Sequence, residues 1–189
     1  MKFLLFLSLL TQFAITNAQD QWALAKDKDR IQIFTRKLDH QKVKEFKAIT
    51  YTSKTVDELE RILDDVQHYP NWVYSVSKGK LIDKKGNNRT LYYSLDLPWP
   101  VSDRDLVIQS IKTKDNGLRY DMTAIQGKID EKSGFVRMVN AYGSWQFIPE
   151  KDKVKIVYQF YGDPAGSIPA WMINMMLVDG PFETLMKLR

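Results

Sequence analysis

The feature that most constrains the fold of this chain is a run of six short strand-like segments followed by one long helical segment. The strand-like segments are separated by turn-forming Gly, Asn and Asp residues, for example at Gly86, Asn116-Gly117 and Gly134. Because the breaks are short and evenly spaced, they predict hairpin connections and an antiparallel meander. The candidate strands are 74–83, 89–97, 104–113, 118–126, 135–148 and 154–162.

Two strands and a helix are expected before the meander. The segments 31–36 and 43–53 are rich in β-branched and aromatic residues, which is typical of strands. Thr55 and Glu58 then match the Thr-x-x-Glu capping box, in which a hydroxyl and a carboxylate satisfy free amides at a helix N-terminus. Pro70 ends this helix, because proline cannot donate the next backbone hydrogen bond.

The last segment, 168–188, has the pattern of one long helix. Pro169 falls in its first turn, where a missing N–H group costs little, whereas Gly180-Pro181 lies inside the helix and predicts a kink. The helix is rich in Met, a flexible side chain that suits either an adaptable apolar binding surface or the filling of core gaps. This order of elements predicts an α+β fold, a curved antiparallel sheet that lies against the C-terminal helix.

Composition excludes several classes of function. The 28 Lys and Arg residues barely exceed the 23 Asp and Glu residues, and no run of five like charges occurs, so no nucleic-acid partner is expected. Without cysteine the chain has no disulfide, zinc-thiolate site or thiol nucleophile. Two histidines, His40 and His68, are too few for a catalytic zinc site, and neither a Gly-x-Ser-x-Gly elbow nor a glycine-rich phosphate loop is present. We therefore expect no catalytic residue, no metal and no cofactor.

The first residues, 1–18, predict a secretory signal peptide. Lys2 supplies the positive start, an apolar stretch covers residues 3–10, and small residues up to Ala18 precede the expected cleavage point. The apolar stretch is shorter than the ~20 residues that a membrane-spanning helix needs, although an uncleaved anchor stays an alternative. We expect residues 19–189 to form one exported domain, periplasmic or extracellular, in which a large core replaces disulfides.

Three blocks of the mature chain, together with its opening around Trp22, resemble the START domains, the steroidogenic-acute-regulatory-protein-related lipid-transfer family. Block 163–174, Asp-Pro-Ala-Gly-Ser-Ile-Pro-Ala-Trp-Met-Ile-Asn, resembles the start of the family's C-terminal helix. Block 98–105, Pro-Trp-Pro-Val-Ser-Asp-Arg-Asp, resembles its proline turn and Arg-Asp strand start, and block 65–72, Asp-x-x-x-Tyr-Pro-x-Trp, resembles the segment after its first long helix. The blocks occur in the family's order and extend over nearly the whole mature chain, which resembles the bacterial secreted type.

The resemblance implies a helix-grip fold, in which an antiparallel sheet wraps around a C-terminal helix and encloses a hydrophobic tunnel. It implies binding or transfer of one lipid or other apolar small molecule without catalysis, and we expect a monomer that contacts a membrane transiently. Two alternatives on the same fold stay open. One is an enzyme similar to polyketide cyclases and aromatases, and the other is an interaction protein similar to helix-grip proteins tied to coenzyme Q.

Strand alternation and the implied tunnel together select candidate ligand-binding residues. Apolar side chains on shared strand faces and on the C-terminal helix would form the lining, and four polar side chains, Tyr93, Ser110, Asn140 and Tyr158, would orient the ligand. A sheet face that packs dry against the helix is the alternative. The ligand-binding candidates are Leu91, Tyr93, Leu106, Ser110, Asn140, Tyr142, Tyr158, Met172, Met175 and Phe182.

One departure from the family pattern concerns charge. Some sterol-binding members share a buried acid–arginine pair inside the tunnel. An ungapped count from Arg104-Asp105 places those two positions on Leu91 and Ser110, which are both neutral. The tunnel is therefore expected to hold no charged pair, and a sterol ligand is not implied. Arg104 and Asp105 themselves are expected to be a structural ion pair at a strand edge.

Overall fold

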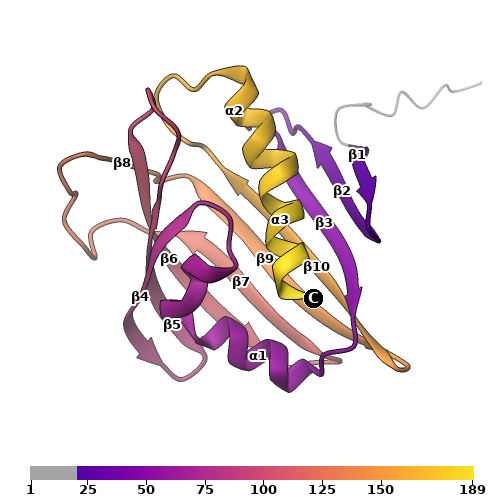
Figure 1. The fold of residues 1–189 in the computed structure, drawn as a ribbon. Helices are drawn as coiled ribbons and strands as arrows, with labels where there is room; N and C mark the ends of the chain where they lie inside the picture. Colours follow the sequence, from indigo (N-terminus) through magenta and orange to yellow (C-terminus); the bar gives the residue numbers. More distant parts are fainter. Residues whose placement is uncertain (1–20) are drawn as a thin grey trace, which may run out of the picture.

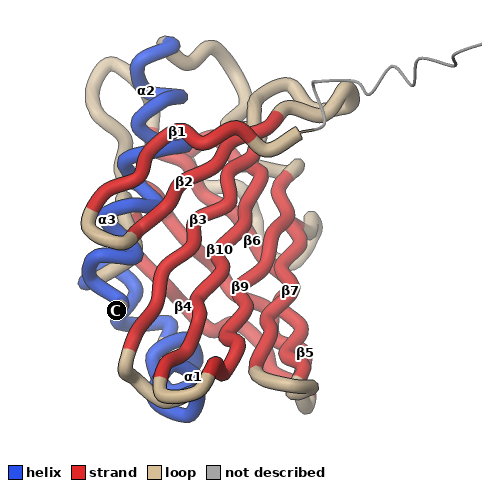
Figure 2. The backbone as a smooth tube through the Cα atoms, turned by 90° about the vertical axis from the view of Figure 1, so that its right-hand side faces the viewer, coloured by secondary structure: helices blue, strands red, loops and turns tan. Residues whose placement is uncertain are grey.

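One curved sheet forms most of the molecule, and the helices lie on a single face of it (Figure 1, Figure 2). The structure is a computed structural model that describes residues 21–189, so the predicted leader, residues 1–18, lies outside the described residues. The strands are β1 (Ala23–Lys28), β2 (Ile31–Arg36), β3 (Glu45–Thr52), β4 (Val76–Lys85), β5 (Asn88–Leu95), β6 (Asp103–Thr113), β7 (Leu118–Ala124), β8 (Phe135–Arg137), β9 (Ala141–Glu150) and β10 (Lys153–Gly162).

The sheet follows the order β1-β2-β3-β10-β9-β7-β6-β5-β4, and β8 is added beside β6. Every pairing along this path is antiparallel, whereas β8 runs parallel to β6. Strand β10 joins the N-terminal hairpin strands to the later meander, because it pairs with β3 on one side and β9 on the other. The expected antiparallel sheet with a C-terminal helix is confirmed.

Strand β1 was not expected, because its side chains show no alternation and most of them are exposed. Backbone pairing with β2 holds it at the edge of the sheet. Just before it, Trp22 packs between two cations. The Arg36 guanidinium and the Lys47 ammonium each lie 4.4 Å from the centroid of the indole ring. Such tertiary contacts leave no periodic signal in the sequence.

The structure corrects the single strand expected over 135–148. The chain forms β8 beside β6, leaves the sheet at Met138, and returns as β9 between β7 and β10. The Met138 backbone N–H donates to the Asp105 carbonyl (2.8 Å), and the Met138 side chain is buried. Strand-forming residues continue through the break, so only the choice of neighbouring strands reveals it.

Helix α1 (Val56–Asp64) begins with the predicted capping box. The Glu58 N–H donates to the Thr55 hydroxyl (3.2 Å), and the Thr55 N–H donates to the Glu58 carboxylate (2.7 Å). Leu59 and Leu63 are the buried residues of this helix. The chain then forms a 3-10 turn, Val66–Asn71, which contains Pro70 and directs the chain into β4.

The C-terminal helical segment consists of α2 (Ala170–Asn174), a π-helical turn (Met175–Asp179) and α3 (Gly180–Leu188). The predicted disturbance at Gly180-Pro181 takes the form of this π turn, in which the Gly180 N–H donates to the Met175 carbonyl. Because Pro181 has no N–H group to continue the regular pattern, the wider turn accommodates it. The turn inserts one extra residue and rotates the helix face that follows.

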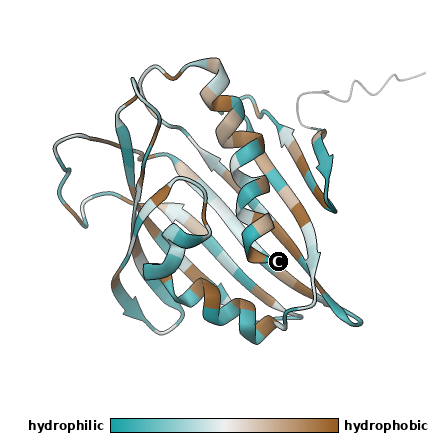
Figure 3. Ribbon diagram, viewed as in Figure 1, coloured by the Kyte–Doolittle hydropathy of each residue, from teal (hydrophilic) through white to brown (hydrophobic). Residues whose placement is uncertain are grey.

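The core lies between the sheet and the helices, on what we call the helix face of the sheet. Strand residues at alternate positions supply it, for example Ile31 and Ile33 on β2 and Phe147 on β9. Figure 3 shows hydrophobic positions along the strands behind α3 and on both α1 and the C-terminal helix. Within residues 21–189, no helix combines the length and the apolar character needed to cross a membrane.

Candidate ligand-binding site

A cavity of about 150 Å³ lies between the helix face of the sheet and the C-terminal helical segment. Seven strands contribute to its wall, and the π turn and α3 close it from the other side. No charged side chain is part of this wall. The lining residues are Phe46, Tyr69, Val73, Tyr74, Ser75, Val76, Tyr93, Leu95, Leu97, Leu106, Ile108, Met122, Met138, Trp145, Tyr158, Phe160, Gly162, Met176, Gly180, Pro181 and Thr184.

An aromatic wall forms the sheet side of the cavity. The Tyr158 ring is stacked on Trp145, with 3.7 Å between centroids and 5° between planes. Phe46 meets the same tyrosine edge-on at 4.9 Å. Further along, Tyr69 and Tyr93 are stacked at 5.6 Å. Each ring is held by its neighbours, so the wall is a rigid surface for a ligand.

Three tyrosine hydroxyls gather near this wall. The Tyr69 hydroxyl donates to the Leu63 carbonyl (2.8 Å). Burial raises the pKa of Tyr69, Tyr93 and Tyr158, and the neighbouring Tyr69 hydroxyl raises the pKa of both Tyr93 and Tyr158 further. All three therefore stay protonated at neutral pH, and they are hydrogen-bonding groups without charge.

The helical side of the cavity is held close by a glycine. A Cβ atom at Gly180 would lie only 2.9 Å from the Tyr74 ring. The Tyr74 backbone N–H also donates to the Thr184 hydroxyl (3.0 Å). The segment after the 3-10 turn is thereby attached to α3, and Met176 in the π turn completes the lining.

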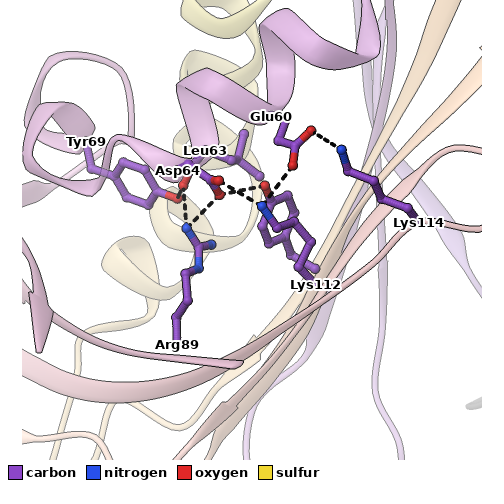
Figure 4. Close-up of polar contacts among 8 residues, drawn as sticks. Glu60, Leu63, Asp64, Tyr69, Arg89, Lys112 and Lys114 are labelled. Atoms are coloured by element: carbon purple, nitrogen blue, oxygen red, sulfur yellow. Dashed lines mark hydrogen bonds and ion pairs between the residues drawn. The ribbon is translucent and has the colours of Figure 1, made fainter. Parts of the chain in front are cut away.

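A cluster of charged side chains occupies the other end of the helix face, beneath α1 (Figure 4). Arg89 on β5 is 3% exposed, and its Nη1 donates to the Asp64 carboxylate (2.8 Å) and to the Leu63 carbonyl (3.3 Å). The Tyr120 hydroxyl donates to the same carboxylate (2.8 Å). Lys112 donates to the second Asp64 oxygen (2.8 Å). The buried guanidinium thus has a charged partner and a carbonyl partner.

Glu60 extends this cluster toward the surface. It pairs with Lys112 at 2.8 Å and with Lys114 at 2.6 Å, and hydrogen bonds from these two lysines lower the pKa of Glu60. Burial raises the pKa of Asp64, but the hydrogen bonds from Lys112 and Tyr120 and the nearby charges outweigh that effect and lower it. Both carboxylates are ionised at neutral pH.

Three of the ten predicted ligand-binding residues line the cavity: Tyr93, Leu106 and Tyr158. Leu91 and Ser110 are buried on the same face but outside the lining, nearer to α1. Ser110 lies directly across from Arg89 in the β5–β6 pair. The lining itself is uncharged as expected, yet this face of the sheet also carries a buried cation that the ungapped count did not find.

The other two strand candidates, Asn140 and Tyr142, do not line the cavity. Asn140 is exposed before the strand, and the Tyr142 hydroxyl accepts a hydrogen bond from Gln41 (2.8 Å) outside the cavity. Trp145, three residues further along β9 and on its other face, lines the cavity instead. Aromatic residues occur at both odd and even positions of this strand, so the sequence alone does not show which of them face the cavity.

The helix candidates are displaced by the π turn. Met175 does not line the cavity, whereas the adjacent Met176 does. Met172 is fully buried outside the lining, and Phe182 packs under the Lys26 ammonium, which lies 4.2 Å from its ring centroid. A regular helix was assumed in the prediction, and one inserted residue changes which side chains face the sheet. Ligand binding by any of the ten residues stays a prediction.

The expected ion pair of Arg104 with Asp105 is wrong. The Asp105 carboxylate accepts two hydrogen bonds from Arg137 on β8 (2.7 and 2.9 Å). Arg104 instead donates to the carbonyls of Pro164 (2.8 Å) and Ala165 (3.0 Å). Neighbouring strand residues point to opposite faces, so each finds a different partner. Arg104 thereby attaches the segment before α2 to the start of β6.

Residues 21–189 contain no cluster of three or more His, Asp or Glu side chains placed to hold a metal ion.

Comparison with known proteins relates the chain to lipid-transfer proteins. The sequence profile of the START domain family matches residues 11–188. A Pseudomonas aeruginosa protein named uncharacterized protein PA1579 is 32% identical over 173 residues, which is 90% of this chain and 86% of that protein.

Two solved structures show the same architecture. The STAR-related lipid transfer protein of Xanthomonas axonopodis superposes with a TM-score of 0.82 at 31% identity, over 90% of this chain and 97% of that one. Human StAR-related lipid transfer protein 5 superposes with a TM-score of 0.78 at 17% identity, over 92% of this chain and 86% of that one. The human likeness concerns the fold alone.

Proposed function

The chain belongs to the START domain family, and on that premise we propose that it binds one lipid or other apolar small molecule, without catalysis, in the cavity beneath the C-terminal helix. The observation that supports this most directly is the uncharged wall of aromatic and aliphatic side chains. Burial of apolar surface contributes about 25 cal/mol per Å². Ligand binding would therefore draw its free energy mainly from desolvation.

Ligand uptake in this proposal requires the C-terminal helical segment to move. The cavity of about 150 Å³ is smaller than the ~300–1,000 Å³ of most ligand pockets. The sheet wall is rigid because its rings are interlocked, whereas the helical wall contains a π turn and the flexible Met176 side chain. Displacement of α2 and the π turn is the simplest way to enlarge the space.

A binding function fits the lining better than the cyclase-like alternative does. General acid–base catalysis needs a group whose pKa lies near the working pH. The titratable groups that line the cavity are tyrosines, and burial raises the pKa of Tyr69, Tyr93 and Tyr158 away from neutrality. The charged side chains beneath α1 lie outside the lining. These observations favour binding over proton-transfer chemistry.

We also propose transient contact with a membrane at the end of the molecule where α2 begins. Trp171 in α2 is 55% exposed, and Trp99 in the turn before β6 is 90% exposed. Arg104 attaches the segment before α2 to the start of β6, so the segments that carry the two tryptophans, α2 and the turn before β6, are linked. Tryptophan rings favour the membrane–water interface. A monomer would present this end to a bilayer during transfer.

Met176 and Met175 give a matched test of the cavity. Met176→Trp places a large ring in the lining, and we expect it to weaken binding of a neutral fluorescent fatty acyl ester about tenfold, since overpacking costs about 1–3 kcal/mol. Met175→Trp changes the neighbouring position outside the lining and should stay within about twofold. Fluorescence titration and a melting curve for each variant provide the measurement. Unchanged affinity in a folded Met176→Trp protein would contradict the proposed site.

We propose further that the protein is exported and that residues 1–18 are removed. The charged start, apolar stretch and small residues of the leader support this proposal. The intact mass of protein recovered from the periplasm or medium of its host should correspond to a chain that begins at Gln19. Recovery of the exported protein with Met1 still attached would contradict this proposal.

A further inference from the structure

We infer that the cavity selects a neutral, ring-bearing molecule with a hydrogen-bond acceptor oxygen, and that the Tyr158 hydroxyl donates the hydrogen bond that selects it. This inference rests on the proposed binding function and specifies the chemistry of its ligand. Aryl ketones are the simplest compounds of this class. Fatty acids, whose charged head and long chain differ from it in both respects, are the contrasting class.

The position of the Tyr158 hydroxyl is fixed by packing. Trp145 stacks on one face of the ring at 3.7 Å, Phe46 meets it at 4.9 Å, and Phe160 lies 6.5 Å away. These neighbours restrict the ring to one orientation on β10. A donor held in place before binding loses little conformational entropy when a ligand accepts its hydrogen bond.

The Tyr158 hydroxyl differs from the Tyr69 and Tyr93 hydroxyls of the lining, because these two adjoin each other whereas no side chain within 21–189 hydrogen-bonds to Tyr158. The Tyr69 hydroxyl donates to the Leu63 carbonyl, and the Tyr93 hydroxyl adjoins the Tyr69 hydroxyl. Thr184 accepts the Tyr74 backbone N–H on the helical side. A ligand that fills the cavity would take water away from this hydroxyl, so a ligand oxygen that accepts from Tyr158 avoids leaving a desolvated donor without a partner.

The charge of the wall excludes an ionised ligand. A carboxylate brought into the cavity would find no cation in the lining, and burial of an unpaired charge is strongly unfavourable. Arg89, the buried cation beneath α1, is already held by Asp64 and the Leu63 carbonyl. An ammonium group would meet aromatic faces but no carboxylate. Tyrosine hydroxyls therefore favour a neutral carbonyl or ether oxygen.

The size and shape of the cavity favour rings over an extended chain. An engineered protein cavity of about 150 Å³ is known to bind benzene, which sets the scale for the space present here. The flat faces of Tyr69, Tyr93, Trp145 and Tyr158 match a planar ring, since aromatic pairs gain energy in stacked and edge-on arrangements. One ring or two fused rings therefore need a smaller displacement of the C-terminal helical segment than an extended chain does.

Four naphthalene probes of similar size test the inference: methyl naphthyl ketone, ethylnaphthalene, naphthoate and naphthylmethylammonium. Calorimetry on the mature chain at neutral pH should show the ketone binding about fivefold tighter than the hydrocarbon, as expected for one neutral hydrogen bond. Naphthoate and the ammonium probe should bind at least about a hundredfold more weakly than the ketone. Equal or tighter binding of either charged probe would overturn the inference, and tight naphthoate binding would redirect attention to Arg89.

Tyr158→Phe isolates the proposed donor, because it removes the hydroxyl and keeps the ring. We expect the variant to bind the ketone and ethylnaphthalene about equally, because the ketone loses affinity while ethylnaphthalene affinity stays unchanged. Tyr51→Phe, on the exposed opposite face of β3, is the matched control and should keep the preference. A folded Tyr158→Phe protein that still prefers the ketone would overturn the role of Tyr158.

The probes also separate this inference from the binding function on which it rests. If the neutral fluorescent fatty acyl ester binds and no naphthalene probe does, the ring-ketone inference is wrong and the proposed function stands. If neither the neutral acyl ester nor any naphthalene probe binds to folded protein, the proposed function itself fails. If the ketone binds best and Tyr158→Phe removes the preference, both are supported.

Discussion

The two ends of the helix face are built from the same strands but are filled in opposite ways. Beneath α1, Arg89 and Lys112 both donate hydrogen bonds to the Asp64 carboxylate (Figure 4). Beneath the C-terminal helix, the wall is uncharged, its rings stack laterally, and a cavity remains. Tyr69 connects the two ends, because its hydroxyl bonds the Leu63 carbonyl beside Arg89 while its ring faces the cavity.

This contrast indicates which end stabilises the fold and which end is available to a ligand. Charges buried at the α1 end are tolerable only while each keeps its partner, so that end has little freedom to change. Apolar contacts at the cavity end are not directional, and a ligand can replace one set of them with another. The π turn places the irregular part of the helix over the end that can change.

The largest expected effect comes from a second cation at the α1 end. Ser110→Arg would place a guanidinium at a site that is 1% exposed and directly opposite Arg89. We expect the free energy of unfolding to fall by about 3–5 kcal/mol, as for other uncompensated buried charges. Thr113→Arg, at the exposed end of the same strand, should change it by less than about 0.5 kcal/mol. Chemical denaturation measures both, and a tolerated Ser110→Arg protein would show that this position is not sealed.

Removal of the carboxylate partner should have a smaller effect. Asp64→Ala leaves Arg89 buried without its charged partner, but the Asp64 side chain is itself 33% exposed and water can replace part of the contact. We expect a loss of about 2–3 kcal/mol, below the full value for a broken buried pair. Asp57→Ala on the exposed side of α1 is the control, expected at about 0.5 kcal/mol. The affinity of folded Asp64→Ala protein for the neutral acyl ester should be unchanged, and a loss of both stability and affinity would argue that the two ends act as one unit.

The smallest expected effect, and the sharpest contrast, concerns pH. The lowered pKa values of Glu60 and Asp64 mean that these groups stabilise the fold above their unfolded pKa values near 4 and lose that contribution as pH falls through the folded ones. The pKa values of Tyr120 and Tyr158 are raised in the folded protein, so the unfolded chain ionises first as pH rises. Stability therefore also falls above the ordinary tyrosine pKa of about 10.

Between those limits, ligand affinity should barely change. No lining side chain titrates between pH 5.5 and 8, so affinity for a neutral probe should vary by less than about twofold over that range and should respond weakly to salt. Fluorescence titrations across pH, compared with melting temperatures at the same pH values, test this. A steep change of affinity near neutral pH would show that a titrating group reaches the ligand.

Local sequence patterns determined the elements whose formation depends on near neighbours. The capping box at Thr55, the turns of the meander and the disturbance before Pro181 are all visible in short segments. The family resemblance rested on such segments too, and it supplied the helix-grip arrangement that the structure confirms. What these segments share is that each contains its own hydrogen-bonding or steric reason for its conformation.

The site depended on choices that no short segment contains. Alternation shows that β9 has two faces, but only its pairing with β10 decides that Trp145 and not Tyr142 meets Tyr158. A helical wheel places Met175 and Met176 almost equally well, and the π turn selects Met176. The sequence by itself therefore determined that there is a sheet, a helix and an apolar face between them. Tertiary structure decided which residues line the cavity, because strand pairing and helix phase are set by contacts between distant parts of the chain.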